Sequence, residues 1–100
     1  MAMSEFTYDG IDPVVLYDMF YEMGTQLGGH IIAMARTSDN EAESTYWRHC
    51  LRAVDDERDS IDWRDTDAQI LAIERWKQER DDLAAILETA RDHAHQPVAV

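Results

Sequence analysis

Apolar residues that recur every three or four positions most constrain the fold of this chain, because that spacing places them on one face of an α-helix. Three such runs occur, over residues 13–36, 39–59 and 66–93, and none of them has the strict alternation typical of a strand. Short polar segments separate the runs. The pattern predicts an all-α fold in one domain, an antiparallel bundle of three or four helices.

Residues that cap helices stand at the start of each run. Asp12 followed by Pro13 is typical of a first helical turn, where the missing N–H of proline costs nothing. Ser and Glu at the ends of 38–41, and Thr and Gln at the ends of 66–69, have capping-box spacing. Because glycine disfavours a helix interior, we expect a break or kink near Gly28, which would divide the first run into two helices.

The apolar face of each run predicts the core. The expected core residues are Leu16, Phe20, Met23, Leu27, Ile31 and Met34 in the first run, Tyr46, Trp47, Cys50, Leu51, Ala53 and Val54 in the second, and Ile70, Ile73, Trp76, Leu83 and Leu87 in the third. Between the second and third runs, Ile61 and Trp63 are expected to close the end of the bundle. Residues 96–100 follow the last helix and are expected to form a loose tail.

Acidic residues dominate the composition, with 21 Asp and Glu against 9 Lys and Arg and a formal net charge of −12. A chain of this charge is not suited to bind duplex nucleic acid directly. The single cysteine, Cys50, cannot form an internal disulfide, which indicates a reducing compartment. No apolar run approaches the length of a membrane span, and the first residues lack the pattern of a signal peptide. We therefore expect a cytoplasmic protein without a membrane partner.

Seven acidic residues and two arginines stand between residues 55 and 67. Thirteen residues of helix span about 20 Å, over which one nucleic-acid strand carries about six charges and a duplex about twelve. The segment thus approaches the charge density of a single strand. The predicted partner-binding surface is Asp55, Asp56, Glu57, Asp59, Asp62, Asp65 and Asp67, with Glu74, Asp81 and Glu88 as flanking support. The alternative interpretation is a solvated face whose acidity serves solubility or salt adaptation.

Aromatic and methionine side chains are abundant in the first run, more than one helix face can bury. Tyr17 and Tyr21 fall away from the side that carries Leu16 and Phe20. Such residues are enriched at protein interfaces, so they are an alternative, apolar partner-binding site. The other interpretation is that they cover the core of a small bundle.

Patterns of catalysis and metal binding are weak in this sequence. His93 and His95 could hold a metal only loosely, since zinc needs three or four converging ligands. His49 and Cys50 are neighbours whose side chains diverge on a helix, so they form a poor catalytic pair. We expect no enzyme, no metal and no cofactor. A metal-dependent nucleotide hydrolase would need carboxylate pairs at a spacing that is not found here.

The opening Met1-Ala2-Met3-Ser4 and the following Thr7-Tyr8 resemble the start of the Ocr-type anti-restriction proteins of podophages. Residues 62–67, Asp-Trp-Arg-Asp-Thr-Asp, are similar to a short acidic stretch of that family, although they lie further along this chain. Members of the family are small, acidic, helical DNA mimics. Residues 96–100 replace the acidic C-terminal tail of the family. The resemblance implies a phage-encoded inhibitor directed at the host.

The leading hypothesis is a non-enzymatic inhibitor of phage or mobile-element type, anti-CRISPR or anti-restriction, that binds a basic nucleic-acid-binding surface of a host protein. The alternative is a helical structural, assembly or antitoxin-type module that uses the apolar face of the first helix and could form a homodimer.

Overall fold

The computed structural model describes residues 8–95 and contains three α-helices, with no strand in this range. Helix α1 is Pro13–Arg36, α2 is Glu41–Ser60 and α3 is Thr66–His95. The predicted all-α fold is confirmed, whereas the expected tail at 96–100 lies outside the described residues. No helix in the described part of the chain has the length and apolarity needed to span a membrane.

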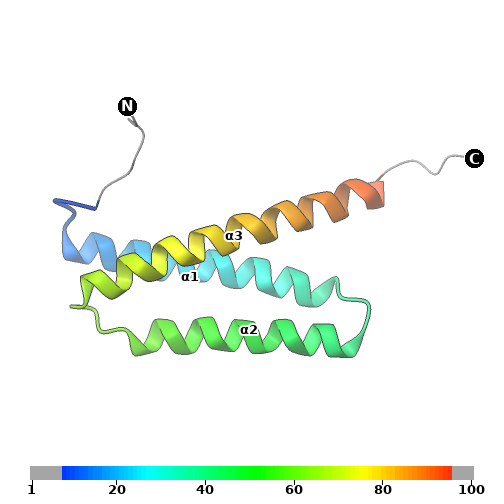
Figure 1. Cartoon of the computed structure of the whole chain (residues 1–100), viewed down its shortest axis with the longest axis horizontal. Helices are drawn as coiled ribbons and strands as arrows, with labels where there is room; N and C mark the ends of the chain where they lie inside the picture. Colours follow the sequence, from blue (N-terminus) through cyan, green and yellow to red (C-terminus); the bar gives the residue numbers. More distant parts are fainter. Residues whose placement is uncertain (1–7, 96–100) are drawn as a thin grey trace, which may run out of the picture.

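Helix α1 packs against both other helices, and α2 and α3 stay apart. Within residues 8–95, no Cα atom of α2 lies within 8 Å of a Cα atom of α3. Figure 1 shows α2 and α3 meeting at the connector, residues 61–65, and spreading apart toward the opposite end of the molecule. The Cα trace is 17 Å across its thinnest direction. The three helices therefore form a flat, open arrangement and not a closed triangle.

The helix starts follow cap chemistry, but only one cap is the residue that the sequence indicated. Asp12 accepts a hydrogen bond from the N–H of Val14 at 2.8 Å, with Pro13 in the first turn. Helix α2 is capped by Asn40, not by Ser38, because the Asn40 side chain reaches the N–H of Glu43 at 2.8 Å.

Helix α3 is capped one residue before the predicted capping box. The carboxylate of Asp65, and not the hydroxyl of Thr66, accepts from the N–H of Ala68 at 3.1 Å. An acceptor one residue earlier satisfies the same free N–H groups of the first turn. Gln69, expected to close the box, points into the protein instead.

Helix α1 is one continuous helix of 24 residues, so the expected division near Gly28 is wrong. Gly24 and Gly28 are buried where the other helices approach α1. A Cβ at Gly24 would lie 3.2 Å from both Arg58 Cδ and Trp76 Cζ3, and one at Gly28 would lie 3.3 Å from Leu51 Cδ1. These glycines serve close helix packing, which outweighs their weak helix propensity.

The core lies along α1 where the other helices cover it. Its buried apolar residues are Leu16, Phe20, Leu27, Ile31, Val54, Ala72, Ile73, Trp76 and Leu83. Phe20 stacks on Trp76 with ring centroids 5.3 Å apart. Helix α2 buries only Val54, and Tyr46, which was expected in the core, is 58% exposed. The expected inner face of α2 is therefore only partly covered.

The connector is held by Gln69, a fully buried polar residue. Its side-chain amide donates to the carbonyls of Asp62 at 3.0 Å and Trp63 at 2.8 Å. Ile61 packs against the core as predicted. Trp63 does not, since it is half exposed, with the Arg64 guanidinium 5.2 Å from its ring centroid. A buried amide, and not the indole, closes this end of the molecule.

Candidate functional site

The predicted acidic segment is not one straight helix. It comprises the last turns of α2, the connector and the first turn of α3. Two of its carboxylates shape the backbone there. Asp62 accepts from the N–H of Arg64 at 2.8 Å, and Asp65 caps α3. These two acids have structural roles at a chain reversal, independent of any partner.

Two further acids of the segment are engaged in ion pairs. Asp55 lies 3.3 Å from the guanidinium of Arg58 on the same helix. Glu57 accepts a hydrogen bond from Arg75 of α3 and so bridges the two helices that otherwise stay apart. The remaining three, Asp56, Asp59 and Asp67, are exposed. None of these three forms an ion pair within the described residues. They are the carboxylates most available to a partner.

The fold adds acids from α1 to this region. The first half of α1 lies beside it, since Tyr8 donates to Glu74 and Arg58 donates to Thr25 Oγ1 at 3.0 Å. We define residues 8–22 and 55–75 as the acidic end. It carries twelve acidic and three basic residues, a net charge of −9 out of the −12 of the whole chain. The charge is therefore concentrated at one end of the molecule.

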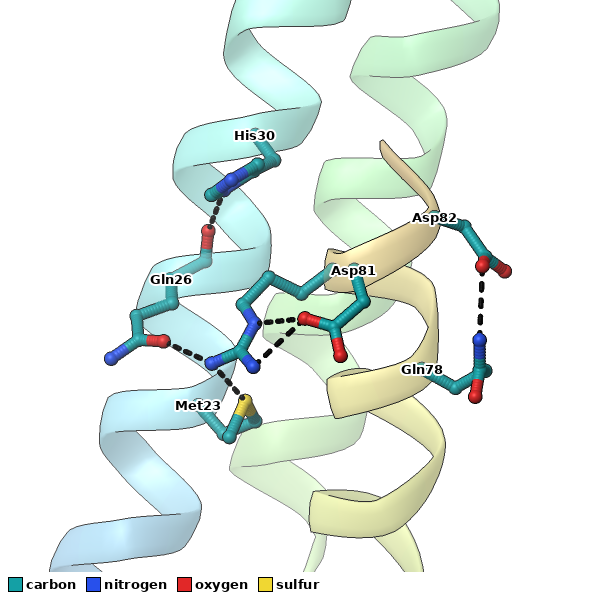
Figure 2. Close-up of polar contacts among 7 residues, drawn as sticks. Met23, Gln26, His30, Gln78, Asp81 and Asp82 are labelled. Atoms are coloured by element: carbon teal, nitrogen blue, oxygen red, sulfur yellow. Dashed lines mark hydrogen bonds and ion pairs between the residues drawn. The ribbon is translucent and has the colours of Figure 1, made fainter. Parts of the chain in front are cut away.

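The three predicted flanking acids are not gathered beside the segment. Glu74 belongs to the acidic end, where it accepts from Tyr8. Asp81 accepts two hydrogen bonds from its neighbour Arg80, whose guanidinium also donates to Gln26 of α1 at 2.6 Å. Figure 2 shows Asp81 and Gln26 on facing helices at this contact. Glu88 lies further along α3, near Arg91 beside a hollow against α1.

The hydroxyl of Tyr8 has a perturbed acidity. Partial burial, followed by the hydrogen bond to Glu74 and the charge of that carboxylate, raises the pKa of Tyr8 to about 12. All three causes favour the neutral phenol, since a partly buried phenolate would lose hydration and would face another anion. The contact ties the segment that precedes α1 to α3.

The alternative apolar site of α1, Tyr17 and Tyr21, is largely covered by other side chains of this protein. Tyr17 is half-buried, with its ring centroid 5.8 Å from that of Phe20. Tyr21 is 46% exposed, but the Arg58 guanidinium covers one face of its ring at 4.1 Å from the centroid. Arg58 also donates to the carbonyl of Tyr21. This arginine, which the sequence showed only as an offsetting charge, joins α2 to α1.

An apolar groove between α2 and α3 is the surface that the sequence did not reveal. It has a volume of about 380 Å³. We call it the α2–α3 groove; its lining includes Ile31 from α1, Tyr46, Trp47 and Cys50 from α2, and Trp76 and Leu83 from α3. The same residues were predicted to be core. Ile31, Trp76 and Leu83 are indeed buried, but the divergence of the two helices leaves Tyr46 exposed and Trp47 and Cys50 half-buried. Periodicity does not encode that angle.

The polar residues that line this groove are Tyr46, Glu57, Arg75, Glu79 and Asp82. The side chain of Cys50, and more weakly Glu79, raises the pKa of Tyr46. No cluster of three or more His, Cys, Asp or Glu side chains with metal-binding geometry occurs in the part of the chain that the structure describes. The groove and the acidic end can bind other molecules by apolar contact and by charge, respectively.

Comparisons with models of known protein families, with curated proteins and with solved structures gave no significant match.

Proposed function

We propose that the protein is a non-enzymatic inhibitor that binds a basic, nucleic-acid-binding surface of another protein and blocks it. Anti-restriction and anti-CRISPR proteins of phages or mobile elements are the concrete forms of this function. The observation that carries the proposal is the net charge of −9 at the acidic end, to which all three helices contribute. The proposal takes the helices as one antiparallel bundle that presents this end as a rigid surface.

The mechanism is electrostatic occlusion. Exposed carboxylates, with Asp56, Asp59 and Asp67 at the centre, take the places of phosphates in a groove lined by arginine and lysine. Opposite charge speeds the encounter and selects basic partners. Because the groups are exposed, salt screens the attraction and weakens binding.

The test is a pull-down from a bacterial lysate with the immobilised protein. The captured proteins are washed in steps from about 50 mM to about 1 M NaCl, and the eluted proteins are identified by mass spectrometry. We expect a nucleic-acid-binding protein that elutes as the salt concentration rises. Added DNA should compete with the immobilised protein for it. Recovery of a partner that resists salt and ignores DNA would contradict charge mimicry.

A matched pair of variants separates local charge from total charge. Asp56→Asn with Asp59→Asn removes two charges from the last turns of α2 in the acidic end. Glu88→Gln with Asp92→Asn removes two from the last turns of α3, outside it. We expect the first pair to weaken partner binding about tenfold and the second less than about twofold. Equal effects of the two pairs would show that only total charge matters, and the proposal would fail.

A second candidate is assembly through α1, favoured by two valines in its first turn. Val14 is 65% and Val15 50% exposed, and Val14 lies on the same helix face as Tyr21. Light scattering should then show a mass that rises with concentration, and Val14→Glu should abolish the increase. A monomeric mass at all concentrations would exclude this candidate.

A further inference from the structure

The α2–α3 groove is a long apolar channel with α1 as its floor. Leu27 and Ile31 of α1 form the base, and α2 and α3 form the walls. The Arg75–Glu57 ion pair crosses between the walls near the connector. From there the walls spread apart toward the other end of the molecule (Figure 1). The twelve residues from Tyr46 to Glu57 correspond to about 17 Å of helix, or three turns.

The walls present the apolar side chains that a fourth helix would cover. Trp47 and Cys50 are half-buried in the groove, and Tyr46 is 58% exposed at its wide end. On α3, Ile86 is 51% exposed and lies one turn beyond Leu83 on the same face. Helices in contact pack with axes 8–10 Å apart, with side chains interdigitated. The space between α2 and α3, above α1, offers a fourth helix such packing.

The rim of the groove is acidic. Glu57, Glu79 and Asp82 line it, with Arg75 as the basic residue opposite Glu57. Within residues 8–92, Glu79 and Asp82 form no ion pair, and the side-chain amide of Gln78 donates to Asp82 at 2.9 Å. A segment that fills the channel would therefore meet two carboxylates without a basic partner along the α3 wall.

We propose that the α2–α3 groove is a docking site for an amphipathic helix of another protein, with an apolar stripe at i, i+3 or i+4 and i+7 spacing flanked by Arg or Lys. The apolar stripe matches the channel, and the basic flanks match Glu79 and Asp82. This site adjoins the acidic end at Glu57 and Arg75 but does not depend on the function proposed for that surface.

Charge argues against a second copy as the occupant. A copy brings the same acidic rim and the same net charge of −12, so the approach of two copies is repulsive. A basic helix is attracted to this protein over its whole approach. Oppositely charged partners associate faster, and like-charged partners are suppressed.

The first experiment uses three synthetic 18-residue helical peptides and fluorescence anisotropy with the intact protein. The probe has leucines on one face with arginines beside them. One control has the same composition with the leucines spread around the helix, and the other keeps the stripe but has glutamates in place of the arginines. We expect saturable binding of the probe and at least about tenfold weaker binding of both controls. Equal binding of the scrambled peptide would mean charge attraction alone and would overturn the proposal.

Variants then locate the site. Tyr46→Glu alters an exposed lining position on α2, and Ile86→Glu alters an exposed position on α3 one turn beyond the lining residue Leu83. Folding should survive both changes, and each should weaken probe binding about tenfold or more. Ala85→Glu is the matched control, because it adds the same charge to α3 one residue away on another face. Equal losses for Ile86→Glu and Ala85→Glu would contradict the assignment. Glu79→Gln with Asp82→Asn should weaken binding of the arginine probe several-fold.

Two outcomes separate this site from the other surfaces. The Asp56→Asn and Asp59→Asn pair should leave probe binding within about twofold, so a failure of the function proposed for the acidic end leaves the groove intact. Sedimentation of the protein alone should give a monomer. A dimer that Tyr46→Glu dissociates would assign the groove to a second copy and overturn the proposal of a basic partner.

Discussion

The acidic end and the α2–α3 groove are built from the same three helices, yet their surfaces differ in kind. At the acidic end, Gln69 holds the connector and Arg58 ties α2 to α1, and the net charge is −9. The rest of the described chain, residues 23–54 and 76–95, carries eight acidic and six basic residues, a net charge of −2. There Tyr46 and Ile86 are exposed.

The difference shows how helix spacing decides what becomes surface. Where α2 and α3 are joined by a short connector and bridged by Glu57 and Arg75, side chains from three helices meet and the core is closed. Where the two helices diverge, the same periodic apolar stripe has no helix opposite and lines a groove. Negative charge is thus concentrated at one end of the molecule, whereas exposed apolar side chains occur at both ends, with Val14, Val15 and Leu71 among those at the acidic end.

The largest expected effect compares two tryptophans, one in the closed core and one on the connector. Trp76 is 1% exposed and stacked on Phe20, so Trp76→Ala should lower the free energy of unfolding by about 4 kcal/mol. Trp63 is 53% exposed, so Trp63→Ala should cost less than about 1 kcal/mol. Urea unfolding followed by circular dichroism measures both. Similar losses would mean that the connector is packed more tightly than the structure shows.

A smaller loss in the free energy of unfolding is expected when the buried amide that holds the connector is removed. Gln69→Ala leaves two carbonyls without their donor and should cost about 2 kcal/mol. Gln78→Ala is the control, since this exposed glutamine of α3 donates only to the exposed Asp82, and its loss should be below about 0.5 kcal/mol. If the two variants unfold alike, polar contacts do not hold the acidic end together.

Charge removal should stabilise the acidic end and barely affect the other. Asp56→Asn with Asp59→Asn relieves repulsion and an unfavourable interaction with the C-terminal dipole of α2, so we expect a gain of about 0.5–1 kcal/mol at low salt. The Glu88→Gln and Asp92→Asn pair should increase the free energy of unfolding by less. Thermal melting over a salt series tests this, because screening should raise the melting temperature of the parent and remove the difference. A flat response of the parent would show that its charges are already balanced internally.

The smallest expected effect is a pH dependence at Tyr8. Its pKa is raised to about 12 in the folded state against 10 for the ordinary side chain, so folding favours the neutral phenol. The contribution to stability is complete below pH 10 and is lost as the pH rises toward 12. Between pH 9 and 12, the free energy of unfolding of the parent protein should therefore fall more steeply than that of Tyr8→Phe. Parallel curves would place the phenol outside the contact with Glu74.

Local chemistry made the helices predictable from the sequence. The spacing of Leu16, Phe20, Leu27 and Ile31 predicts a helix face that is buried, and Asp12 predicts its cap. Errors at the other caps amount to one or two residues, because several neighbouring side chains can accept from the same free N–H groups. The sequence predicted three or four helices because glycines within a helical run are compatible with two structures. They can break the helix, or they can let another helix pack closely against it.

The candidate sites were predictable only in part. The acidic segment is visible in the sequence, but the engagement of Glu57 with Arg75, eighteen residues away, is not. The sequence placed Tyr46, Trp47 and Cys50 on an inner face and could not show that this face lacks an opposing helix.

The sequence by itself determined an all-α fold, the apolar faces of its helices and an excess of negative charge, since these follow from residue type and from spacing within one or two turns. Only the tertiary structure decided which carboxylates are engaged, that most of the charge lies at one end, and that α2 and α3 leave a groove. The physical reason is range. Periodicity and caps act within a helix, whereas the angle between two helices depends on side chains far apart in the chain.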